Sequence, residues 1–142
     1  MTYAYAFALC LSFLSDPTLS PTVAARGCRL SLDVVEAAEA QSVPAPVLAA
    51  IAWRESRFNP DVVSRVGACG AWQVIPRYVE ADDCVGVVEQ GADAGADMLR
   101  RWLRRKKTFD RALQAYAGCS RKRCPWYSGA VLDRARAWGY DG

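Results

Sequence analysis

The 142-residue chain is 52% hydrophobic and 23% charged, with a formal net charge of +3 at pH 7. These values fit one globular domain with its own hydrophobic core and exclude a disordered chain. Because there is no histidine, and because the six cysteines form no CxxC pair, we exclude histidine relays and histidine metal sites and regard a zinc ribbon as unfavoured. We expect no cofactor and no bound metal.

The N-terminal run Tyr3–Leu14 is apolar and too short to span a bilayer as an ordinary transmembrane helix. It resembles the hydrophobic part of a signal peptide, with Val23-Ala24-Ala25 as a cleavage sequence, although no positive charge precedes it. Two alternatives follow. Residues 1–25 are either a signal peptide or an apolar segment that packs on a domain formed by residues 26–142. No stable membrane insertion is expected.

Helical periodicity begins near Ser31, a predicted N-cap, and continues until Pro44 interrupts it. Pro46 suits the first turn of a second helix. That helix is predicted to stop at Asn59-Pro60, because the residue before a proline disfavours the α region.

Glu55 lies near the end of this second helix. Val47 and Ile51 precede it at four-residue steps, so the acid continues a stripe that faces the core. Burial disfavours the charged form and should raise the pKa of Glu55. A carboxyl that keeps its proton near neutrality is suited to general acid catalysis.

A long helix is predicted from Val87 to Arg105, with acids early and bases late, as the helix dipole favours. Its basic end, Arg100–Lys107, has the composition of a nucleic-acid or membrane patch. The acids earlier in the same helix favour a solvated helix end, and we expect no nucleic-acid partner. The predicted inner face consists of Val88, Ala92, Ala96, Leu99 and Leu103.

Two further helices complete the predicted fold. One covers Asp110 to Ala117, and the last is capped by Ser128 and ended by Gly139. No segment alternates with a period of two residues. The fold class is therefore all-α, with loops or at most a small hairpin between Ser64 and Gln73.

Six cysteines in a chain of this length indicate an oxidising compartment, whereas the alternative is a set of buried free thiols. The short separations favour Cys69 with Cys84 and Cys119 with Cys124 as local pairs. The sequence leaves the full connectivity open.

A series of motif positions follows Glu55 in a fixed order. It resembles the signature of the soluble lytic transglycosylase (SLT) family over about residues 31–118. The positions are Glu55-Ser56, Phe58-Asn59-Pro60, Ser64, Gly67-Ala68, Gly70, Gln73, Pro76 and Ala115-Tyr116-Ala117-Gly118.

The resemblance implies a single lysozyme-like, SLT-type domain. It also implies a peptidoglycan lytic transglycosylase, which cleaves the β-1,4 bond between N-acetylmuramic acid and N-acetylglucosamine and forms 1,6-anhydro-N-acetylmuramic acid. Glu55 corresponds to the catalytic acid and base. Ser64, Gln73 and Tyr116 correspond to substrate-binding residues, and the Tyr116 hydroxyl is expected to reach toward the glutamate. Ala117 departs from the usual asparagine of the family, which concerns efficiency or substrate preference.

Several alternatives stay open at this point. A goose-type muramidase would hydrolyse the same bond, and a non-catalytic peptidoglycan-binding or assembly protein would keep the cleft without turnover. The mild positive charge suits an anionic glycan strand as partner, and a cell-wall-spanning assembly is a further expected partner. We expect an exported (periplasmic, cell-wall or secreted) or phage-associated protein. Trp72 is expected either to stack on a sugar ring or to belong to the core.

Overall fold

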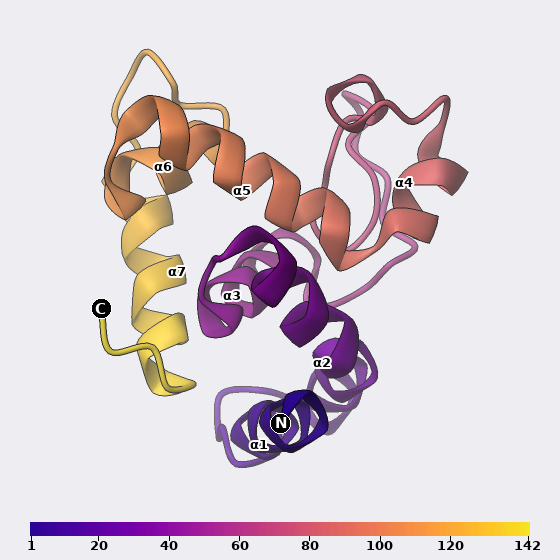
Figure 1. Cartoon of the computed structure of the whole chain (residues 1–142), viewed down its shortest axis with the longest axis vertical. Helices are drawn as coiled ribbons and strands as arrows, with labels where there is room; N and C mark the ends of the chain where they lie inside the picture. The colour runs from indigo at the N-terminus through magenta and orange to yellow at the C-terminus, as the bar shows by residue number, and fades with distance from the viewer.

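The structure, a computed structural model of residues 1–142, is entirely helical apart from its loops, which confirms the all-α prediction (Figure 1). None of the helices combines the length and the apolar character needed to cross a membrane. The elements are α1 (Thr2–Leu14), α2 (Pro21–Gln41), α3 (Ala45–Ser56), the 3-10 helix η1 (Pro76–Val79), α4 (Cys84–Gln90), α5 (Ala92–Lys106), α6 (Phe109–Tyr116) and α7 (Pro125–Ala137).

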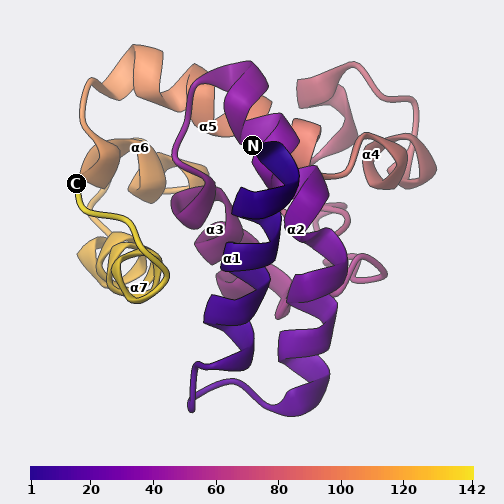
Figure 2. The same cartoon turned by 60° about the horizontal axis from the view of Figure 1, so that its bottom comes forward.

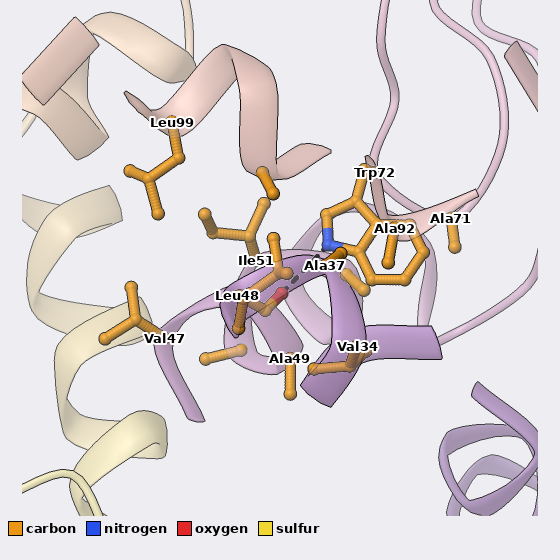
Figure 3. Close-up of a cluster of buried hydrophobic side chains, with 14 of the residues drawn as sticks. Val34, Ala37, Val47, Leu48, Ala49, Ile51, Ala71, Trp72, Ala92 and Leu99 are labelled. Carbon is orange, nitrogen blue, oxygen red and sulfur yellow. Dashed lines mark hydrogen bonds between the residues drawn. The ribbon is translucent and has the colours of Figure 1, made fainter. Parts of the chain in front are cut away.

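Helix α3 lies in the middle of the molecule, with α2, α5 and α7 packed around it (Figure 1). Residues 47–52 are all 0% exposed, so the predicted stripe of Val47 and Ile51 is confirmed. The alanines among them let the neighbouring helices approach closely, and Leu48 and Ile51 fill the space between these helices (Figure 3). This packing fixes the position of the helix that carries Glu55.

Trp72 belongs to this core, which decides between the two alternatives for it. The side chain is 3% exposed, and its indole Nε1 donates a hydrogen bond to the Leu48 carbonyl oxygen at 2.9 Å (Figure 3). Gly95 of α5 lies directly against the indole, where any Cβ would overlap it. The indole therefore packs the loop after α3 onto α3 and α5.

Helix α1 lies alongside α2 (Figure 2). Its inner face buries Leu9 and Phe13, which are 2% and 1% exposed. The Phe13 ring centroid lies 5.0 Å from that of Phe58 and 4.7 Å from that of Trp138. The N-terminal segment thus packs against residues from both the middle and the end of the chain.

Two further connections hold α1 in place. A disulfide joins Cys10 of α1 to Cys28 of α2. Beyond the end of α1, the Asp16 carboxylate accepts hydrogen bonds from Arg134 Nη1 at 2.7 Å and from Trp138 Nε1 at 2.9 Å. The start and the end of the chain are therefore joined by an ion pair whose carboxylate is largely buried.

Two predicted helix starts are wrong. Helix α2 begins at Pro21, where the Ser20 side chain accepts a hydrogen bond from the Val23 N–H, and Ser31 is a buried interior residue. Helix α7 begins at Pro125, and Ser128 is buried within it. In both cases a proline in the first turn, with its fixed φ, marks the true start.

The long helix predicted from Val87 to Arg105 is in fact two helices, α4 and α5. Gly91 separates them with φ 59° and ψ −128°, a conformation that excludes ordinary residues. The first N–H of α5, on Ala92, donates to the Asp33 carboxylate at 2.9 Å. The predicted inner face therefore continues only along α5, and Val88 of α4 is 42% exposed.

Three disulfides are present, and they include both predicted local pairs, Cys69–Cys84 and Cys119–Cys124. The predicted small hairpin is limited to isolated antiparallel bridges, Val63 with Cys69 and Cys69 with Val74. The Cys69–Cys84 disulfide closes residues 70–83, which include η1, and the Cys119–Cys124 disulfide closes residues 120–123. The first of these loops thus contains the predicted substrate-binding residue Gln73, and the second follows Tyr116.

Candidate active site

Glu55 occupies the last turn of α3, beside a cavity of about 480 Å³. The helix ends directly after it because Arg57 and Phe58 take positive φ values of 56° and 62°. The Ser56 hydroxyl then donates to the Ala71 carbonyl oxygen at 2.9 Å, which holds the following loop against the helix end. The acid is therefore partly buried by the core on one side and faces the cavity on the other.

The Glu55 carboxylate accepts one hydrogen bond within the protein, from the Tyr127 hydroxyl of α7 to Oε2 at 2.6 Å. Loss of hydration by burial raises the pKa of Glu55 above its ordinary value, although the Tyr127 hydrogen bond and the charge of Arg54 oppose this effect. Burial and the nearby carboxylate also hold the pKa of Tyr127 well above 10, so the phenol stays a donor. The direction predicted for Glu55 from its apolar stripe is confirmed.

No second acid lines this cavity. Among the acids that follow Glu55 in the sequence, Asp83 caps α4 by accepting the Gly86 N–H, while Asp61, Glu80 and Asp82 are exposed. Glu55 takes part in none of the ion pairs, so it does not serve as the ion-pair partner of a neighbouring arginine. The cavity thus contains one carboxyl group.

Ser64 and Gln73 both line the cavity with Glu55. The Ser64 hydroxyl oxygen accepts the Ala68 N–H at 3.1 Å, and its own hydrogen has no acceptor in the protein. Gln73 Nε2 donates to the carbonyl oxygens of Val62 and Gly70, both at 2.9 Å, whereas its Oε1 accepts no hydrogen bond. Each side chain thus supports its loop and keeps one polar group for a ligand.

Tyr116 also lines the cavity, at the end of α6, but its hydroxyl donates to the Trp72 carbonyl oxygen at 2.7 Å. The hydroxyl bonded to Glu55 is that of Tyr127, which the sequence did not indicate. Next to Tyr127, the exposed indole of Trp126 faces the same cavity, with the Arg54 guanidinium 5.5 Å from its centroid. No motif marks these residues, because α7 reaches Glu55 only through tertiary packing.

The profile of one protein family, described as the transglycosylase SLT domain, matches residues 34–127. The chain belongs to this family. Comparison with curated proteins and with solved structures gave no significant match.

The SLT match includes the whole of α3, the loops around the cavity and the residues up to Tyr127. It confirms the resemblance derived from Glu55 and the motif positions that follow it. At the level of the family, the SLT domain is a transglycosylase-type domain that acts on peptidoglycan. The three disulfides agree with the oxidising, exported surroundings in which such a domain meets the cell wall.

Proposed function

We propose that this SLT domain is a lytic transglycosylase that cleaves the β-1,4 bond between N-acetylmuramic acid and N-acetylglucosamine, with Glu55 as its sole acid and base. One observation carries the proposal: Glu55 is the single carboxyl group in its cavity. Most glycoside hydrolases need a second carboxylate as nucleophile or base. A reaction whose nucleophile belongs to the substrate does not need this second carboxylate.

The proposed reaction uses one carboxyl group twice. Protonated Glu55 donates its proton to the glycosidic oxygen as the bond from that oxygen to C1 breaks. The resulting carboxylate then accepts the proton of the C6 hydroxyl while O6 of the same sugar bonds to C1. This closes the 1,6-anhydro ring and leaves Glu55 protonated for the next cycle. Because the nucleophile belongs to the substrate, no water has to be positioned.

Tyr127 supports this assignment by distinguishing the two carboxyl oxygens of Glu55. Its phenol donates to Oε2, and Oε1 has no partner in the protein. When Glu55 is protonated, the acidic hydrogen therefore belongs on Oε1, which is left for the substrate. Tyr127 acts as a positioning residue in this scheme.

Substrate binding is proposed for the three residues that the motifs indicate. The Ser64 hydroxyl has a free hydrogen to donate to a sugar oxygen. Gln73 Oε1 is free to accept from an acetamido N–H. Tyr116 keeps a lone pair on a hydroxyl oxygen whose hydrogen is already committed to Trp72.

Digestion of purified sacculi tests the proposal. A lytic transglycosylase yields fragments that end in anhydro sugars and contain no label when the reaction runs in oxygen-18 water. Labelled reducing ends would instead indicate a goose-type hydrolase. Binding of sacculi without any fragments would indicate a non-catalytic protein, and the Glu55→Gln variant is the control for contaminating enzymes.

An exported or phage-associated setting is part of the same proposal. The substrate lies outside the cytoplasm, and all six cysteines are paired. A role within a cell-wall-spanning assembly would require a protein partner in addition to the glycan strand.

A further inference from the structure

A second cavity, of about 630 Å³, adjoins the one that contains Glu55. The two share Ile75, Tyr116 and Gly118 in their walls, so they lie side by side. The outer wall of the second cavity is built by the C-terminal half of α5, which lies beside α6 (Figure 1), and by Tyr78 of η1. We call this second cavity the arginine arm.

The arginine arm is strongly cationic. Arg101, Arg104 and Arg105 line it, and its wall contains no aspartate or glutamate. Arg101 has an ion-pair partner, since its Nη2 lies 3.2 Å from Asp97 Oδ2. Arg104 and Arg105 have none. The structure thus places two unpaired guanidinium groups at the wall of a cavity that adjoins the cavity of the candidate catalytic acid.

The aromatic groups of the arm hold part of this charge in place. The Arg105 guanidinium lies 5.6 Å from the centroid of Trp102, which also lines the cavity. The Lys106 ammonium donates to the Ser120 carbonyl oxygen at 2.8 Å, which connects the end of α5 to the basic loop 120–123. The contact with Trp102 leaves the N–H edge of the Arg105 guanidinium free to bind a ligand.

The negative end of the α5 dipole opposes an anion here, but it amounts to only about half an elementary charge. The two unpaired guanidinium groups outweigh it. A planar fork of N–H donors matches a carboxylate better than any neutral sugar group. The sequence interpretation of Arg100–Lys107 as a merely solvated helix end is therefore incomplete, because four of these residues, Arg101, Trp102, Arg104 and Arg105, line the cavity.

We propose that the arginine arm binds a carboxylate of the substrate, carried by the peptide stem of the glycan strand whose sugars occupy the Glu55 cavity. This inference rests on the proposed function. The same chemistry has a second source, the lactyl carboxylate of N-acetylmuramic acid, which is free only after the stem has been removed. The test below distinguishes these two sources.

The experiment measures binding of soluble glycan strands in a Glu55→Gln background, so that it does not depend on cleavage. Three strand preparations are compared: strands with intact stems, strands with stem carboxylates converted to methylamides, and strands stripped of their stems. The test variant carries Arg104→Gln and Arg105→Gln. Arg136→Gln is the matched control, because Arg136 is half-exposed on α7 and pairs with Asp133, outside the arm.

We expect the double variant to bind intact strands about tenfold more weakly, as the loss of charge-assisted hydrogen bonds implies. The difference in affinity between the double variant and its Glu55→Gln parent should vanish for methylamide strands. Arg136→Gln in the same background should bind all three strand preparations as the parent does. A loss confined to stripped strands would support a carboxylate site and assign it to the lactyl group. Equal losses on intact and methylamide strands, or no loss at all, would overturn the proposal.

Two controls complete the design. Arg104 and Arg105 are exposed, so their replacement should leave the Tm essentially unchanged, which thermal unfolding checks. Wild-type protein that binds intact strands selectively but releases no fragments would refute the proposed reaction and leave the carboxylate site standing. Normal cleavage by a protein whose binding does not depend on stem or lactyl carboxylates would overturn the carboxylate site and leave the proposed reaction standing.

Discussion

Phe13→Ala should destabilise the whole domain, although Phe13 lies in the segment that resembles a signal peptide. The ring is 1% exposed and packs between Phe58 and Trp138. It also lies against the Cα of Gly27, where a Cβ would come within 2.7 Å of it. With neighbours on so many sides, the site cannot collapse after truncation, so the cost should fall in the range of about 3–5 kcal/mol.

Thermal unfolding of the purified, oxidised protein measures this cost. For a domain of this size each kcal/mol corresponds to about 2–4 °C, so the Tm should fall by about 6–20 °C. Phe7→Ala is the matched control. It removes the same ring from the same helix, but Phe7 is 65% exposed, so its effect should stay within about 0.5 kcal/mol.

The intact mass of protein from an exporting host completes the test. We expect residues 2–14 to be present in the folded protein, joined to α2 by the Cys10–Cys28 disulfide. A Tm unchanged by Phe13→Ala would refute the argument from packing. A mature chain that begins after Ala25 would support the signal-peptide alternative instead.

Three further predictions concern the site. Glu55→Gln should lower the cleavage rate by at least ~10². Because burial raises the pKa of Glu55, its contribution to stability is present at low pH and is lost as the pH rises through the raised pKa, so Glu55→Gln should unfold no earlier than wild type at neutral pH. Activity near that of wild type would move the acid elsewhere. Tyr127→Phe removes the hydrogen bond that favours the carboxylate, so the pKa of Glu55 should rise further, and the alkaline limb of the pH–rate profile should move to higher pH. A limb that stays in place would show that Glu55 does not determine it. Replacing Cys69 and Cys84 by serine should lower stability by roughly 2–3 kcal/mol in denaturant unfolding under oxidising conditions, while an unchanged midpoint would contradict a role for this disulfide in stability.

The sequence predicted those parts of the fold that depend on local signals. The stripe of Val47 and Ile51 and the helix start near Pro46 are properties of short segments, and the structure confirms both. The break at Gly91 was missed because the apolar spacing continues across it. Gly91 breaks the helix there, and Asp33, from a distant part of the chain, accepts the first N–H of α5 and so stabilises the new helix start.

The same distinction applies to the candidate site. Glu55, Ser64, Gln73 and Tyr116 form an ordered motif, and the structure brings all four to one cavity. Tyr127 lies far from Glu55 in sequence, and its partner follows only from the packing of α7 on α3. A tyrosine after a tryptophan gives no local signal for such a contact.

The two loop disulfides enclose two segments that differ in how far they can be exchanged. Residues 70–83 and 120–123 each begin and end at a disulfide, and neither segment contributes to α3. The 120–123 loop could be replaced by a loop of another sequence between the same cysteines without cutting the helix that carries Glu55. The 70–83 loop could not be exchanged as a whole, because it contains Trp72 of the core and Gln73 of the Glu55 cavity. Substrate range in this domain is thus open to change by loop grafting, with the acid and its buried helix kept as a constant frame.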